Sequence, residues 1–346
     1  MFAVSATLTT RLNEPAGLFF HGGALVYALA AYLTGFAGLL SASWLVNAAG
    51  TLLLAHGMVV AAYLLHECAH NTVFRRQSDN ARLGRALTWL CGACYSTYED
   101  IRYKHFRHHV DNDDVVWFDY EAFFERHPAL TRIIKALEFV YVPAHEVLMH
   151  ALMAFSSFVI PQRRGQRFRN VTVLAVRGVL FVALALYSPK AALLYVVAYV
   201  LMLHVLRFMD MLQHDYPYTL SLFEPARAPH KGDAAWEQAH TFSNPVSLRW
   251  PWLNALVLNF GYHNAHHADM SVPWYRLPSL HRRLTDDDPS AVIPFRAQAA
   301  LYHRNRVRRV HNPQPADYPK GPDYLAVARS GRGPVGGNAA SFLTAF

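Results

Sequence analysis

The sequence predicts an all-α integral membrane protein, in which four transmembrane helices form two hairpins and histidines on one side of the membrane hold two metal ions. Three observations lead to this fold class. Two long apolar blocks interrupt the chain of 346 residues, basic residues gather between those blocks, and histidines form three short clusters beside them. A chain of this length could also form two soluble domains, but a soluble helical hairpin would show polar faces, which the first block lacks.

The first apolar block contains no Asp, Glu, Lys or Arg from Pro15 to Leu65. A helix of about 20 apolar residues crosses a bilayer, so a run of this length is enough for two crossings. We expect spans over about 22–41 and 45–65, joined by a short turn. Residues 1–21 are expected to form a short amphipathic lead, with Leu18, Phe19 and Phe20 able to lie in the membrane interface. A cleaved signal peptide is not expected, because the apolar run that follows Arg11 and Glu14 is far too long for its hydrophobic region.

The second apolar block runs from Val171 to about Met211, and Ser188-Pro-Lys190 is a turn signal within it. We expect spans over about 171–188 and 190–212, with Arg177 extending towards the membrane interface. The predicted membrane domain covers residues 22–285. Residues 286–346 are expected to form a polar C-terminal tail that is disordered from about residue 329, where the chain becomes rich in glycine.

The formal net charge of +8 is distributed in a way that indicates membrane topology. Basic residues are dense between the two blocks: Arg75, Arg76, Arg82, Arg85, Arg102, Lys104, Arg163, Arg164, Arg167 and Arg169. The turns within the blocks carry only Lys190. Because cytoplasmic loops carry an excess of Lys and Arg, we expect both termini and the histidine clusters on the cytoplasmic side of a bacterial inner membrane. A nucleic-acid partner is not expected, since no basic and aromatic binding motif is present.

Eight histidines form the three clusters: His66 and His70; His105, His108 and His109; and His263, His266 and His267. On a helix, residues three or four apart lie within about 60° of one another around the axis, so each cluster presents its imidazoles on one face. Neutral imidazoles that converge from rigid elements are typical of a metal site. The second and third clusters share the spacing H-x-x-H-H, which makes a coincidence of unrelated histidines a poor explanation.

His214 is a ninth candidate ligand, because it follows the fourth span and lies four residues after Asp210. Nine imidazoles are too many for one ion and suit two, although imidazole alone does not select among iron, zinc and copper. Nearby carboxylates could accept the second ring N–H of the ligands and so orient them. The candidates for this role are Asp210, Glu67, Asp111, Asp113 and Asp114. No catalytic side chain beyond the metal centre is expected.

Two other functions compete for parts of this pattern. His66-Glu-Cys-Ala-His70 matches the H-E-x-x-H motif of zinc proteases, yet an intramembrane protease would leave the two H-x-x-H-H clusters unexplained. A metal transporter would place ionisable residues in the middle of its spans, whereas the first hairpin offers only His56 there. The three cysteines, Cys68, Cys91 and Cys94, favour packing over a disulfide framework.

The order and spacing of these clusters resemble the integral-membrane fatty acid desaturase and hydroxylase superfamily. The run Asn259-Phe-Gly-Tyr-His-Asn-Ala-His-His267, followed by Val272-Pro-Trp-Tyr-Arg-Leu-Pro278, is similar to the region of the third histidine box in that family. The resemblance covers about residues 20–285. It implies four spanning helices, a cytoplasmic cap and a non-haem di-iron centre. In acyl-CoA members, a histidine ligand and a water-holding asparagine precede the third box; His214 matches the first, whereas Asp210 replaces the second.

The resemblance implies an O2-dependent oxidoreductase of lipid metabolism that removes hydrogen from a fatty acyl chain held as a CoA ester, carrier-protein ester, lipid or free acid. Desaturation is the expected outcome; hydroxylation and oxidative decarboxylation to a terminal alkene remain alternatives on the same site. The chain shows no haem, flavin or iron–sulfur motif, so electrons must come from an external carrier of the ferredoxin or cytochrome type. Exposed basic residues, Arg75, Arg76, Arg163 and Arg164, are candidates to bind an acidic carrier.

Overall fold

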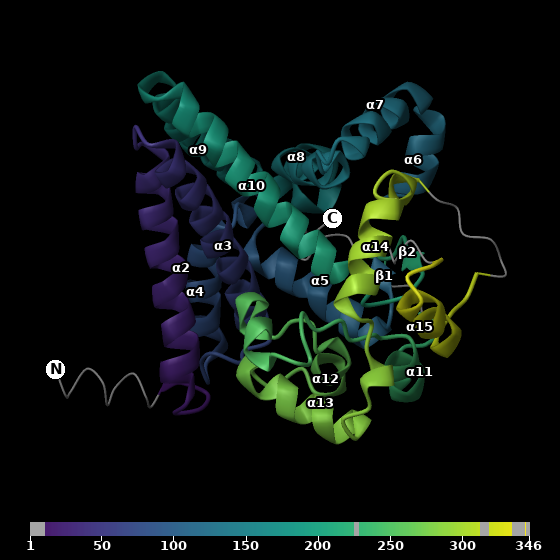
Figure 1. Ribbon diagram of the computed structural model, residues 1–346. Coiled ribbons are helices and arrows are strands. Elements are labelled where there is room, and N and C mark those ends of the chain that lie inside the picture. Colours follow the sequence, from purple (N-terminus) through teal and green to yellow (C-terminus); the bar gives the residue numbers. More distant parts are fainter. Residues whose placement is uncertain (1–10, 225–227, 312–317, 334–342, 344–346) are drawn as a thin grey trace. The chain divides into compact units, whose positions relative to one another are not determined.

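The computed structural model describes residues 11–224, 228–311, 318–333 and 343, which are mostly helical (Figure 1). Within these residues the strands are β1, Asp114–Val115, and β2, Tyr218–Thr219, which pair in parallel. The chain divides into two compact units. The first unit comprises residues 1–101, 149–205 and 343–345, and the second comprises 102–148, 206–342 and 346. The boundary between them falls within helices α5, α8 and α10.

The first unit contains the long apolar helices. Its elements are α2 (Gly17–Leu39), α3 (Trp44–Ala69), α4 (Gln77–Leu90), η1 (Ala93–Tyr95), η2 (Pro161–Gln166), α9 (Arg167–Tyr187) and most of α10 (Pro189–Asp210). Four of its helical segments, Gly17–Leu39, Trp44–Ala69, Pro161–Tyr187 and Pro189–Asp210, are long and apolar enough to cross a membrane. This confirms the predicted helical class and number of spans. The arrangement in two hairpins and the cytoplasmic cap stay predictions.

Glycines bring α2 and α3 into close backbone contact. A methyl group added at Gly35 would lie 2.5 Å from the backbone nitrogen of Leu54, and one added at Gly38 would lie 3.0 Å from Cα of Gly50. Lipid tails are as apolar as leucine, so membrane helices associate through this kind of close packing rather than by the hydrophobic effect. The first span begins at Gly17, five residues earlier than expected, because the end of the predicted lead is already helical.

The connections between the long helices are held by polar side chains. Asn47 Nδ2 donates hydrogen bonds to the carbonyls of Gly38 and Ser41 over 2.8 Å and 3.0 Å, which closes the turn between α2 and α3. Lys190 Nζ, at the start of α10, donates to Asn47 Oδ1 over 2.9 Å. The two turns that the sequence predicts are therefore in contact with each other.

The second unit consists of shorter elements. They are α6 (Tyr120–Arg126), α7 (Pro128–Phe139), α11 (Ala234–Ala239), η3 (Pro251–Val257), α12 (His263–Ala268), η4 (Trp274–Arg276), α13 (Leu277–Thr285), η5 (Pro289–Ala291), α14 (Phe295–Asn305), η6 (Arg308–Val310) and α15 (Pro322–Arg329). Parts of α5 (Tyr98–Asp111) and α8 (Ala144–Val159) also belong to it.

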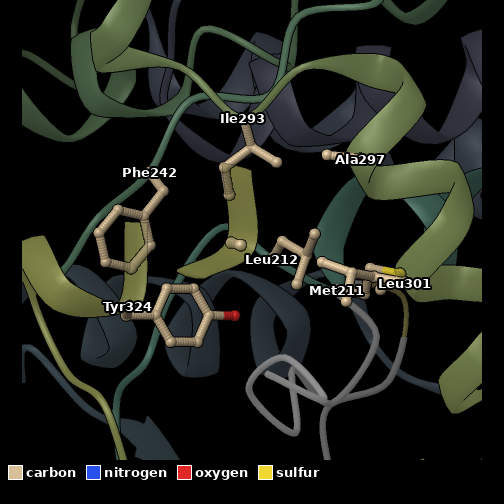
Figure 2. Packing of buried hydrophobic residues seen from close by; sticks show 8 residues of the cluster. Met211, Leu212, Phe242, Ile293, Ala297, Leu301 and Tyr324 are labelled. Atoms are coloured by element: carbon tan, nitrogen blue, oxygen red, sulfur yellow. The ribbon is translucent and has the colours of Figure 1, made fainter. Parts of the chain in front are cut away.

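A buried apolar cluster joins distant parts of this unit (Figure 2). It contains Met211, Leu212, Phe242, Ile293, Ala297, Leu301, Tyr324 and Ala328. Helices α14 and α15, within the predicted polar tail, therefore pack against the residues that follow α10. The boundary at residue 285 stays a prediction, and residues 334–342 and 344–346 of the segment expected to be disordered lie outside the described residues.

A buried ionic network fixes the corner between α7 and α8. Arg207 lies 2.6 Å from Glu138 and 2.9 Å from Glu146, and Arg309 lies 3.1 Å from Glu146. Burial alone would raise the pKa of the Glu146 carboxyl, but Arg207 and Arg309 lower it to about 2. Removing one partner would leave an uncompensated buried charge, so this network ties α7 and α8 to the end of α10 and to η6.

Candidate metal centre

The second histidine cluster lies at the C-terminal end of α5. This helix carries Glu99 and Asp100 in its first turn and His108 and His109 in its last, a distribution that suits the helix dipole. Its H-x-x-H-H spacing places the rings together: His105 and His109 have Nε2 atoms 3.2 Å apart. A regular helix of 14 residues therefore positions this cluster.

The third cluster forms the six-residue helix α12, which depends on tertiary hydrogen bonds. The backbone N–H of Asn264 donates to Ser243 Oγ, and Ser243 Oγ donates to Asn264 Oδ1, both over 3.1 Å. Asn264 Nδ2 also donates to the carbonyl of Thr241. Just before the helix, Gly261 packs against the backbone of residues 244 and 245, where a methyl group would lie 2.8 Å from the Asn244 oxygen.

His214 joins these two clusters in the second unit. It follows α10, and its backbone forms a bridge with Thr241, whose hydroxyl lies 3.3 Å from His214 Nδ1. Its Nε2 lies 3.1 Å from His108 Nε2 and 2.7 Å from His263 Nε2. The ninth candidate ligand is thus placed beside histidines from both H-x-x-H-H clusters.

Four imidazoles converge closely enough to hold one ion. His108, His214, His263 and His267 each offer a ring nitrogen, and these nitrogens lie within 4.8 Å of one another. A metal bound at about 2.1 Å in tetrahedral geometry has ligand nitrogens about 3.4 Å apart, which falls within this range. The arrangement therefore has the dimensions of a metal site.

The chemistry of this donor set also fits a metal. His267 Nε2 is buried and has no hydrogen-bond partner among the residues that the structure describes, although its Nδ1 is paired. Burial, and then the neighbouring histidines, hold the pKa values of His214 and His267 well below the usual value. Both rings are therefore neutral at pH 7, which is the form that binds metal. A bound cation would satisfy the nitrogen that otherwise remains unpaired.

The remaining box histidines form two further groups. Within the second unit, His266 Nε2 lies 3.1 Å from His109 Nε2, and the rings of His105 and His266 stack with centroids 6.2 Å apart. Within the first unit, the rings of His66 and His70 lie 4.7 Å apart at the end of α3. Neither group contains a member of the four-imidazole set.

Carboxylates lie beside two of the four converging rings. Asp114 Oδ1 lies 3.0 Å from His108 Nδ1, and Glu237 Oε1 lies 2.7 Å from His267 Nδ1. A carboxylate that accepts the Nδ1 proton leaves Nε2 as the metal-binding atom. Sequence reasoning missed Glu237, because this residue lies on the short helix α11, 30 residues before His267, and no local motif connects the two.

The other candidate carboxylates have different contacts. Asp111 pairs with Arg107 and, over 3.0 Å, with Lys231. Asp113 contributes its backbone carbonyl, 3.3 Å from His108 Nδ1, while burial raises the pKa of its carboxyl to about 6.

Glu67 and Asp210 complete the set of predicted orienting carboxylates. Glu67 accepts a 2.6 Å hydrogen bond from Thr72 and lies 3.9 Å from His66 Nδ1. Asp210 ends α10, and its carboxylate makes no hydrogen bond to a histidine within the described parts of the chain. Its predicted role in orienting a ligand therefore stays a prediction without a contact to support it.

Comparison with known families agrees with this geometry. The family described as fatty acid desaturase matches residues 42–299, a range that includes His214 and all eight box histidines. No curated protein matches the sequence significantly. The match covers well over half of the chain, and members of this family are oxidoreductases that act on fatty acyl chains. Together with its four membrane-length helices and clustered histidines, the match shows that this integral membrane chain belongs to the fatty acid desaturase family.

Proposed function

We propose that the protein is a non-haem di-iron desaturase that uses O2 to convert a C–C single bond of a fatty acyl chain into a C=C bond. The observation that carries this proposal is the convergence of His108, His214, His263 and His267, of which two are oriented by carboxylates. This donor set consists of nitrogen ligands alone, which can bind iron, zinc or copper, so the choice of iron rests on membership of the desaturase family. Family membership supplies the substrate class.

One ion would be held by the four converging imidazoles. We infer that a second ion would be held by the remaining box histidines, His66, His70, His105, His109 and His266. When bound, two irons would supply the O2 chemistry that breaks an unactivated C–H bond, which no amino acid side chain can do. The box histidines are the ligands in this proposal, and no protein nucleophile is required.

The chain's own residues perform the supporting work. Asp114 and Glu237 hold protons on Nδ1 of His108 and His267, which directs Nε2 of each ring towards the ion. The hydroxyl of Thr241 lies 3.3 Å from Nδ1 of His214, so this ring also has a polar partner at Nδ1. Residues such as Phe260 and Trp274, both largely buried, would exclude water from the bound acyl chain.

We further propose that the metal site faces the cytoplasm of a bacterium and receives electrons from a ferredoxin- or cytochrome-type carrier. The density of Arg and Lys between the apolar blocks supports this orientation. Of the basic residues expected to bind the carrier, Arg75, Arg76 and Arg164 are exposed, whereas Arg163 is buried beside Asp100. Arg163 is therefore excluded from the carrier-binding surface, because a docking residue must reach solvent.

The test is to express the chain in a bacterial host and analyse both membrane acyl esters and headspace by gas chromatography, with an iron assay on purified protein. An internal double bond and about two irons per chain would support the proposal. The control is His127→Ala, which removes an exposed histidine outside the boxes and should leave both results unchanged.

Other products would revise the reaction on the same site. A hydroxylated acyl chain would identify a hydroxylase, and a terminal alkene one carbon shorter than its substrate would identify an oxidative decarboxylase. If the purified protein contained zinc but no iron, and formed none of these products, the di-iron proposal itself would be overturned.

A further inference from the structure

The second unit carries an apolar stripe on the outer face of α7. Thr131, Ile134 and Glu138 form the buried face of this helix. Ile133, Ala136, Leu137 and Val140 are exposed, with the i, i+3, i+4, i+7 spacing of one continuous helix face. The helix is thus apolar on a side that the rest of the unit does not cover.

The stripe continues into the corner between α7 and α8, which Figure 1 shows at the top of the view. Phe139, Tyr141, Val142 and Val147 are exposed there. Such a continuous apolar surface is unusual for a face in contact with water. We name the exposed apolar residues from Ile133 to Val147 the α7–α8 patch.

A second apolar patch lies on and around η3. Leu248, Trp250, Trp252 and Leu256 are exposed, and Trp252 reaches 70% exposure. Asn254 and Val257 are buried on the inner side of the same short helix. We name the four exposed residues the η3 patch. The exposure of Trp252 suits an anchor at a membrane interface rather than a wall of a buried acyl tunnel.

Basic residues border both patches. The guanidinium of Arg306 lies 4.9 Å from the ring centre of Phe139 and 5.4 Å from that of Tyr141, and the guanidinium of Arg249 lies 5.0 Å from that of Trp250. Arg132 and Lys135 lie on α7 itself, and Arg132 is exposed. Apolar and aromatic side chains flanked by Lys and Arg are the composition of surfaces that lie in the headgroup region of an anionic bilayer.

We propose that the α7–α8 patch and the η3 patch rest in the interface of an anionic bilayer, so that the second unit contacts lipid directly as well as through the spans. Along the chain, α8 follows this patch and continues through η2 into α9, a membrane-length helix. The aromatic belt that tryptophan and tyrosine form at membrane interfaces explains why Trp250, Trp252 and Tyr141 are exposed. This proposal does not depend on the identity of the metal or of the product.

The experiment places a nitroxide spin label at one position at a time in the full-length protein, reconstituted in nanodiscs of phosphatidylcholine with phosphatidylglycerol. The labelled variants are Leu137→Cys, Ile133→Cys and Trp252→Cys. The native cysteines are buried, and the unmodified chain labelled in parallel measures their background. The matched control is Leu284→Cys on α13, another exposed leucine that lies beside arginines.

Accessibility to O2, which concentrates in lipid, is compared with accessibility to a nickel chelate, which stays in water. We expect the ratio of the two at positions 133, 137 and 252 to be several-fold higher than at position 284. Equal ratios at all four positions would overturn the proposal, because the patches would then face water. Protection from both reagents would overturn it as well, since a protein surface would then cover them.

The charge part of the proposal has its own readout. The ratio at position 137 should fall when phosphatidylglycerol is omitted or salt is raised, because both changes weaken the attraction of Arg132, Lys135 and Arg306 to the headgroups. Neutral substitutions Arg132→Gln, Lys135→Gln and Arg306→Gln together should abolish this lipid dependence. A ratio that does not respond to phosphatidylglycerol would overturn the preference for an anionic surface.

Discussion

The second and third histidine clusters share one spacing but are supported in different ways. His105, His108 and His109 lie on a regular helix of 14 residues, whose backbone sets their positions. His263, His266 and His267 lie on a helix of six residues, which is too short to be stable alone. Its position depends on Asn264, Ser243 and the close packing of Gly261.

The difference shows that one motif can be fixed locally or by tertiary contacts. Each cluster also has one ring held by a carboxylate, but Asp114 follows its histidine by six residues whereas Glu237 precedes His267 by 30. We therefore expect the two clusters to be equally sensitive to loss of a ligand or of its carboxylate partner, and unequally sensitive to loss of the contacts that position the helix.

Loss of a ligand should have the largest effect and should not distinguish the clusters. His108→Ala and His266→Ala are each expected to abolish product formation and lower the iron content, because an imidazole from both clusters is needed for the metal centre. Gas chromatography of acyl esters and iron analysis would measure this. A fully active variant at either position would refute the assignment of the box histidines as ligands.

Loss of an orienting carboxylate should weaken metal binding by about 10- to 100-fold in either cluster. Glu237→Gln and Asp114→Asn keep the size of the side chain but remove the charge that accepts the Nδ1 proton of His267 and His108. The rate of iron loss to a chelator would measure the effect. Asp111→Asn is the control, because Asp111 pairs with Arg107 and Lys231; an equally fast loss there would contradict a specific role for the other two.

Crowding at Gly261 should affect the third cluster alone. Gly261→Ala places a methyl group 2.8 Å from backbone atoms, which cannot move as a flexible side chain can. We expect a loss of about 1 to 3 kcal/mol in stability, together with lower iron content. Thermal unfolding in detergent would measure it. Gly165→Ala, where no atom lies within 4 Å of the added methyl group, should be neutral, and similar losses at both glycines would show a nonspecific effect.

The smallest effects are expected for substitutions of the residues that lie between the histidines of each cluster. Asn264→Ala removes hydrogen bonds to Ser243 and Thr241, and should cost about 1 kcal/mol or somewhat more because partly buried partners lose their donors and acceptors. Arg107→Ala, at the third position of the second cluster, should change iron content less, since the helix still positions His108 and His109. Iron content and unfolding temperature of both variants would test this order, and the reverse order would contradict it.

The sequence predicted the four spans and the eight box histidines because these features are periodic or local. An uncharged run needs no tertiary information to indicate a span, and H-x-x-H-H places three rings on one helix face. His214 was found by its position after the fourth span, and the structure brings it next to His108 and His263. Its role as a ligand remains a proposal that the His→Ala variants can be extended to test.

Supporting residues could not be predicted in the same way. Glu237 contacts His267 through the fold, and Asp111 makes ion pairs with Arg107 and Lys231. Similarly, the polar composition after residue 285 indicated a tail, although Leu301 and Tyr324 pack into the core of the second unit. A few apolar residues within a polar segment are enough to bury it, and composition averaged over the segment does not show them.

The close contact between α2 and α3 has a consequence for genetics. Helix α2 contributes none of the predicted ligands, yet added methyl groups at Gly35 and Gly38 would meet the backbone of α3, which carries His66 and His70. A random mutagenesis screen for loss of function should therefore recover substitutions in this span as often as at ligands. Such alleles would map to lipid-embedded positions without chemistry of their own, and a compensating second-site change would be expected on the facing helix.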